Sequence, residues 1–101
     1  MARNFRITSL RKDGALHLRL SGDFDGMSAM ELIYALKEHI ALAGTIFIET
    51  DGLSTLLPFG REVFQKNFSF SSRLSRKFVF LGNPGRQLAP SGISCMQNRA
   101  M

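Results

Sequence analysis

The sequence offers few side chains whose types and spacing suit catalysis or metal binding, and the best pair is Asp23 and Asp25 in GDFDG. The two carboxylates stand just ahead of a predicted helix. A divalent cation needs further oxygen ligands, and no third ligand follows at suitable spacing. We therefore expect both to act as anions at a helix start, where the helix dipole favours negative charge.

The remaining reactive side chains do not form a known catalytic arrangement. His17 and His39 fall on different predicted elements, and neither accompanies Cys95 or a serine in a nucleophile-elbow context. No phosphate-binding glycine motif is present, and GNPGRQ is a weak Gly/Pro turn after a strand. The sequence predicts a protein that is not an enzyme, with no catalytic residue, no cofactor and no metal site.

Charge is distributed unevenly along the chain. Residues 1–60 contain six Lys/Arg and seven Asp/Glu and have a net charge of −1. Residues 61–101 contain seven Lys/Arg and one Asp/Glu and have a net charge of +6, which gives +5 for the whole chain. This asymmetry suggests an acidic partner, a nucleic acid or an anionic membrane facing the C-terminal half. The alternative is a solvated basic face. The cations of a nucleic-acid or membrane site would be Arg73, Arg76, Lys77 and Arg86.

Length and composition indicate one globular domain spanning residues 1–101. The single cysteine, Cys95, cannot form an internal disulfide and points to a reducing compartment. The sequence has no apolar run typical of a signal peptide or a membrane span. We therefore expect a cytoplasmic protein.

Hydrophobic periodicity predicts alternating strands and helices. Residues 5–9 and 16–20 alternate as two strands around the turn pair Asp13 and Gly14, which favours an antiparallel hairpin. A helix is expected from a capping box of Ser28 and Glu31 to Gly44. The pattern then predicts a strand over 45–50 that is covered on both faces. It also predicts a helix over 58–68, a strand over 77–82 and a helical turn over 86–88. The order predicts an α/β fold with a mixed sheet.

The second helix begins in an unusual way. Pro58 suits a first helical position, but its neighbour is Leu57, where a polar cap is common. Leu56, Leu57 and Phe59 cannot all turn inward from one short loop, so we expect an exposed apolar surface. The alternative is that Leu56 and Phe59 pack beneath the helix and only Leu57 is exposed.

Several segments together resemble a STAS domain, the family that includes the anti-sigma-factor antagonists of bacteria. They are LRLSGDF, IFIETDGLS, the helix start at Pro58 to Gly60, and KFVFLGNPGRQLAPSGI, and the resemblance spans Phe5 to Ile93. It implies a small mixed β-sheet with helices packed mainly on one face. It also implies a regulatory module that binds a protein.

The sequence departs from the antagonists at their phosphorylation site. The resemblance places the acidic loop position on Leu57 and the serine that a partner kinase phosphorylates on Pro58, while Glu49 replaces a strand-ending aspartate. Proline has no hydroxyl, so no phospho-acceptor exists at this position. Ser54 and Thr55 are weak substitute phospho-acceptors. The alternative is that both are solvated turn residues whose hydroxyls satisfy local backbone groups.

The prediction is therefore a STAS-like regulatory module, not phosphorylated at the usual helix start. Its partner is an anti-sigma-factor-like kinase. The alternative function is a small accessory subunit of a phospholipid-transport ABC complex, with the ABC ATPase subunit as partner. A homodimer through a shortened C-terminal end is a further alternative. The predicted partner-binding residues are Leu56, Leu57, Pro58 and Phe59 at the centre, with Asp23, Asp25, Asp51, Ser54, Thr55 and Arg61 as the rim.

Overall fold

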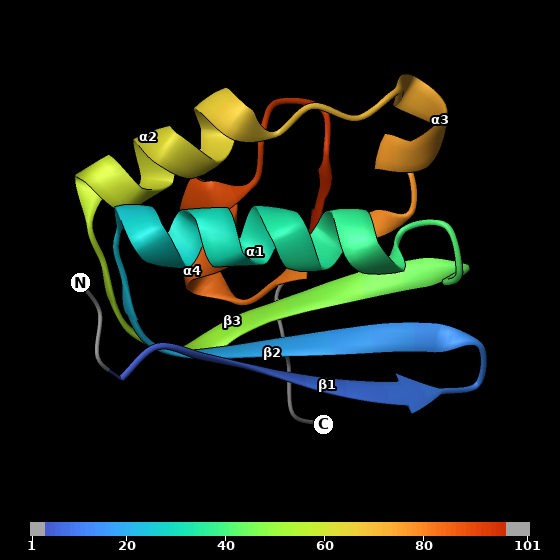
Figure 1. The fold of residues 1–101 in the computed structure, drawn as a ribbon, viewed down its shortest axis with the longest axis horizontal. Coiled ribbons are helices and arrows are strands. Elements are labelled where there is room, and N and C mark those ends of the chain that lie inside the picture. The colour runs from blue at the N-terminus through green and yellow to red at the C-terminus, as the bar shows by residue number, and fades with distance from the viewer. Residues whose placement is uncertain (1–3, 97–101) are drawn as a thin grey trace.

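The computed structural model describes residues 4–96, which form one mixed sheet with helices against one of its faces (Figure 1). Its five strands lie in the order β1-β2-β3-β4-β5 within the described residues. The α/β class predicted from the sequence is confirmed. The elements are β1 (Arg6–Lys12), β2 (Ala15–Phe24), α1 (Gly26–His39), β3 (Thr45–Leu56), α2 (Pro58–Asn67), α3 (Ser72–Ser75), β4 (Phe78–Leu81), α4 (Asn83–Leu88) and β5 (Ser94–Met96).

The predicted hairpin joins β1 and β2, which pair antiparallel. Asp13 and Gly14 have φ angles of 53° and 80°, as a tight primed turn requires, and aspartate and glycine are among the residues that adopt such angles readily. The strands β2, β3, β4 and β5 pair parallel to one another. The antiparallel hairpin therefore extends an otherwise parallel sheet.

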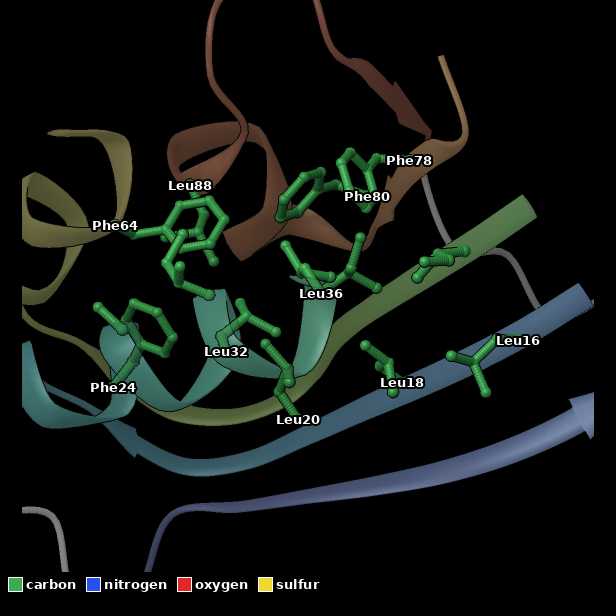
Figure 2. Close-up of a cluster of buried hydrophobic side chains, with 14 of the residues drawn as sticks. Leu16, Leu18, Leu20, Phe24, Leu32, Leu36, Phe64, Phe78, Phe80 and Leu88 are labelled. Atoms are coloured by element: carbon green, nitrogen blue, oxygen red, sulfur yellow. The ribbon is translucent and has the colours of Figure 1, made fainter. Parts of the chain in front are cut away.

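The core lies between the sheet and the helices, and Figure 2 shows its side chains pointing from both layers into one cluster. Alternate residues of β2, β3 and β4 face this cluster, because successive strand side chains point to opposite faces. Helix α1 contributes residues spaced three and four apart, as an amphipathic helix does. The fully buried members are Leu16, Leu18, Leu20, Phe24, Ala29, Leu32, Ile33, Leu36, Ile46, Ile48, Phe64, Phe78, Phe80 and Leu88.

Helix α1 begins and ends earlier than predicted. Its N-cap is Asp25, which accepts a hydrogen bond from the Ser28 backbone N–H at 2.9 Å, so Ser28 lies inside the first turn and not at the cap. Its last residue is His39 with Ile40 as C-cap, and the Gly44 N–H instead donates to the Gly14 carbonyl at 3.4 Å. The predictions of a Ser28 capping box and a Gly44 cap were wrong.

Strand β3 is longer and less covered than predicted. It continues through Leu56 because β2 runs on to Phe24 and supplies pairing partners across two register shifts. The segment after Thr50 is therefore strand and not a turn. Phe47 and Glu49 on the outer face of β3 are only half-buried, so the expected cover on both faces was wrong.

The C-terminal part holds more regular structure than the sequence indicated. Helix α4 begins at Asn83, three residues before the predicted turn, and β5 pairs with β4 at the edge of the sheet. All three residues of β5 are exposed, including Cys95. A homodimer through this edge stays a prediction.

Candidate protein-binding site

The start of α2 is capped by backbone contacts in place of a polar side chain. Leu57 is the N-cap residue and makes no side-chain cap hydrogen bond, and Pro58 occupies the first turn. The Leu57 N–H donates to the Phe24 carbonyl at 3.1 Å, and the Leu57 carbonyl accepts from the Arg61 N–H at 3.0 Å. A leucine is tolerated here because its backbone is paired and proline has no N–H to satisfy.

Two glycines hold the start of α2 against the start of α1. A Cβ added at Gly60 would lie 2.5 Å from the Phe24 carbonyl oxygen and 2.9 Å from that of Asp25. A Cβ added at Gly26 would lie 2.9 Å from the ring of Phe59. The two helix starts are therefore packed backbone to backbone, and the ring of Phe59 lies over Gly26.

The apolar residues around Pro58 are exposed, as predicted. The side chains of Leu57 and Phe59 are 40% and 68% exposed, whereas Leu56 is half-buried and packs against the core. The alternative, with Phe59 beneath the helix, was wrong because the tight contact at Gly60 keeps position 59 on the outer side. Leu57 and Phe59 together are called the α2 knob below.

A groove beside the α2 knob extends the apolar surface across α1. It has a volume of about 580 Å³ and runs between the outer faces of α1 and α2. Met27 and Tyr34 are 60% and 63% exposed within it, and Met30 adds a third flexible or aromatic side chain. Tyr34 belongs to an apolar surface only because α2 lies beside α1. The lining residues are Asp25, Gly26, Met27, Met30, Glu31, Tyr34, Phe59 and Val63.

The acidic residues of the predicted rim have distinct positions. Asp25 caps α1 and lines the groove, as the helix-start interpretation predicted, whereas Asp23 is a residue of strand β2 and does not cap the helix. The hydrogen bond from the Ser28 backbone N–H lowers the pKa of the Asp25 carboxyl below its usual value, and slight burial only partly opposes this effect. Asp23 is half-buried, and its N–H donates to Asn4 Oδ1 at 3.2 Å. Asp51 is exposed and lies beside Gly82, where an added Cβ would meet its carboxylate.

The other predicted rim residues lie on both sides of the α2 knob. Ser54 and Thr55 are exposed within β3, and Thr55 stands opposite Asp23 in the register of β2 and β3. Arg61 is half-buried in the first turn of α2. The structure thus brings Asp25 close to the knob by packing and Thr55 close to Asp23 by strand pairing, whereas Arg61 is near the knob because it lies in the same helical turn.

A polar cluster on the outer face of the sheet was not predicted. His17 Nδ1 lies 2.8 Å from Glu49 Oε2, and Arg19 Nε donates to Glu49 Oε1 at 3.2 Å. Burial raises the pKa of Glu49, but the hydrogen bonds from His17 and Arg19 and their positive charge bring it below its usual value. No local sequence pattern indicates this cluster, because its members come together only when β2 and β3 pair in register.

Within residues 4–96, no group of three or more histidine, cysteine, aspartate or glutamate side chains is arranged to hold a metal ion. No helix in this part of the chain is long and apolar enough to cross a membrane.

Comparison with known proteins finds structures of similar fold and no match by sequence. No family model matches the chain, and no curated protein sequence matches it. Among solved structures, the anti-sigma-factor antagonist SpoIIAA in its unphosphorylated form matches with a TM-score of 0.64 and 15% identity, over 94% of this chain and 89% of that chain. A serine-to-glutamate variant of RsbS from Moorella thermoacetica matches with a TM-score of 0.64 and 18% identity, over 93% and 88%.

The chain has a STAS-like fold. The resemblance to STAS domains predicted from the sequence is thereby confirmed, with helices against one face of a mixed sheet. A third structure, Mglu, matches with a TM-score of 0.56 and 14% identity over 92% of this chain but only 19% of that chain. The STAS-like fold is therefore similar to a minor part of that larger protein.

Proposed function

We propose that this STAS-like domain is a regulatory module that binds a protein partner through the α2 knob and the groove beside it. The observation that carries the proposal is the exposure of Leu57 and Phe59 on a rigidly held helix start. Clustered, exposed apolar side chains commonly mark protein contacts, and a few such residues supply most of the binding energy.

Rigidity makes this surface suited to tight contact. The approach of Gly60 to the Phe24 carbonyl and the fixed φ of Pro58 hold the backbone of the knob in place. A surface that is ordered before binding loses less conformational entropy on association. Removing a large apolar side chain fully from water contributes about 1.5–3 kcal/mol. Burying the parts of Leu57 and Phe59 that are still exposed would therefore contribute a substantial share of the binding free energy of a typical complex.

The proposed binding is constitutive with respect to phosphorylation at the helix start. Pro58 has no hydroxyl at the first turn of α2. Thr55 pairs opposite Asp23, so a phosphate there would add about −1.5 to −2 charges next to a carboxylate. Extended pairing with β2 and the nearby negative charge both disfavour Thr55 as a substitute acceptor. Ser54 lies in the same strand at a register shift and has no Cα partner in β2, so only the nearby negative charge disfavours it.

The fold comparison supports the proposed class of partner. SpoIIAA is an anti-sigma-factor antagonist by its name, and the similarity supports an anti-sigma-factor-like kinase as the partner of this chain. The alternative partner is the ATPase subunit of a phospholipid-transport ABC complex. Both would bind without a phosphoserine at the start of α2, so the identity of the captured protein separates them.

Affinity purification from the native host, followed by mass spectrometry, tests the proposal. The wild type, Leu57→Asp and Leu42→Asp would be compared. Leu42 is 74% exposed in the α1–β3 connection and does not line the groove, so it is a matched control. We expect one regulatory kinase or one ATPase to be captured by the wild type and by Leu42→Asp, and lost with Leu57→Asp. Equal capture by all three proteins would overturn the proposal.

A further inference from the structure

A second hollow lies at the C-terminal end of the fold, away from the α2 knob. It has a volume of about 580 Å³ and is formed by the segment around α3 and by the connection from α4 to β5. Its lining combines serine hydroxyls with one guanidinium, that of Arg76, over two apolar side chains, Phe70 and Ile93. It is called the serine cleft below. Its volume falls within the usual range for small-molecule sites.

The polar groups of the serine cleft are available to a ligand. Among residues 4–96, the side chains of Ser72, Ser91, Ser94 and Arg76 make no hydrogen bond or ion pair. Ser75 is the exception, since its hydroxyl donates to the Phe70 carbonyl at 3.4 Å, beyond the usual length for such a bond. Three hydroxyls and the guanidinium fork therefore offer several donors to one space.

The surrounding charge favours an anion. The segment from residue 63 to the last residue contains no Asp or Glu, because Glu62 is the last acid in the sequence. Arg73 and Lys77 flank Arg76 in the same segment. With no carboxylate nearby in sequence to neutralise it, the Arg76 guanidinium retains its full attraction for a bound anion.

The apolar side of the cleft is held in place by ring packing. The Phe70 ring lies 4.8 Å from that of Phe68 and 4.9 Å from that of Phe78, measured between centroids. Phe78 is fully buried in the core, so Phe70 is anchored to the main body of the fold. Phe70 and Ile93 are both half-buried and present fixed apolar surface to the cleft.

We propose that the serine cleft binds a small phosphate monoester whose organic part is apolar. A phosphate monoester presents three strong acceptor oxygens, which match three hydroxyls and a guanidinium better than the two oxygens of a carboxylate do. Arginine binds phosphate in a bidentate manner. The organic part would lie on Phe70 and Ile93. This site is independent of the α2 knob and of the proposed protein partner.

Titration of the ¹⁵N-labelled protein with phenyl phosphate, followed by amide chemical shifts, tests the proposal. We expect saturable shifts confined to residues 70–76 and 91–94, and weaker binding of inorganic phosphate. Arg76→Gln should weaken the binding of phenyl phosphate about tenfold, as loss of a charge-assisted bidentate contact does. Arg73→Gln removes the same charge from an exposed α3 residue that does not line the cleft, and should leave affinity within about twofold.

Other results would overturn the proposal. These are shifts that do not saturate, equal affinity for inorganic phosphate and phenyl phosphate, or equal weakening by both arginine variants, which would show only diffuse attraction to the basic half. Sedimentation with vesicles containing phosphatidic acid then identifies the source of the phosphate. Binding to these vesicles that phenyl phosphate displaces indicates a lipid headgroup. Binding of phenyl phosphate without sedimentation indicates a soluble ligand.

Discussion

The ring of Phe59 lies over Gly26, so closely that a Cβ at position 26 would approach it to 2.9 Å. This contact joins the first turn of α2 to the first turn of α1 and leaves Phe59 68% exposed on the outer side. The glycines at both helix starts are thus the reason why an apolar knob projects at this point of the fold.

Gly60→Ala should destabilise the protein by about 1–3 kcal/mol, as insertion of a methyl group into a packed contact commonly does. The added Cβ would lie 2.5 Å from the Phe24 carbonyl oxygen, and backbone must move to relieve this. Gly44→Ala is the control, since its Cβ would meet only the Gly14 carbonyl at 3.5 Å. Urea denaturation at 25 °C measures both. A Gly60→Ala protein as stable as the control would contradict the close approach.

Asp25→Ala should cost about 1 kcal/mol of unfolding free energy near pH 7, because α1 loses its N-cap. Asp25→Asn, which retains a capping oxygen, should cost less. The folded-state pKa of Asp25 is lowered, so the charge-dependent part of its contribution is present above the usual 3.8 and is lost as pH falls through the folded-state value. Denaturation at several pH values checks this. Equal stability of Asp25→Ala and wild type at neutral pH would refute the capping role.

Glu49→Gln should destabilise the protein by roughly 1 kcal/mol near pH 7, a modest loss because Arg19 is largely exposed. The folded-state pKa of Glu49 is lowered, so its contribution is present above the usual 4.5 and disappears as the pH falls below that value. Glu62→Gln, at an exposed position of α2, is the control and should have little effect. A Glu49→Gln difference that grows on acidification would be inconsistent with the cluster.

The fold was predictable because alternation and helical spacing are local properties of the sequence. Leu16, Leu18 and Leu20 alternate with polar residues, and this pattern alone assigns one face of β2 to the core. The length of β3 was not predictable. Residues 51–56 lack a clear alternation and become strand only because β2 continues alongside them. The start of α1 was ambiguous because Asp25 and Ser28 both suit an N-cap. In the structure Asp25 is the N-cap, and Gly26, the first residue of the helix, packs against Phe59.

The candidate site was predictable in its centre and not in its extent. Leu57 beside Pro58 is an unusual helix start that the sequence displays directly. Met27 and Tyr34 are ordinary residues of an outward helix face, and they form a groove only because α2 lies beside them. The same holds for the serine cleft, whose Ser72 and Ser94 are distant in sequence and meet only after α4 returns the chain to the edge of the sheet.

The most direct test of the account is the dissociation constant of the purified partner for four proteins: wild type, Leu57→Asp, Phe59→Asp and Leu42→Asp. Circular dichroism and denaturation would first establish that each variant is folded. Leu57→Asp and Phe59→Asp should each weaken binding by at least about thirtyfold, which is the effect of losing a central contact. Leu42→Asp should stay within about twofold of wild type. Unchanged affinity in folded Leu57→Asp and Phe59→Asp proteins would contradict binding through the α2 knob.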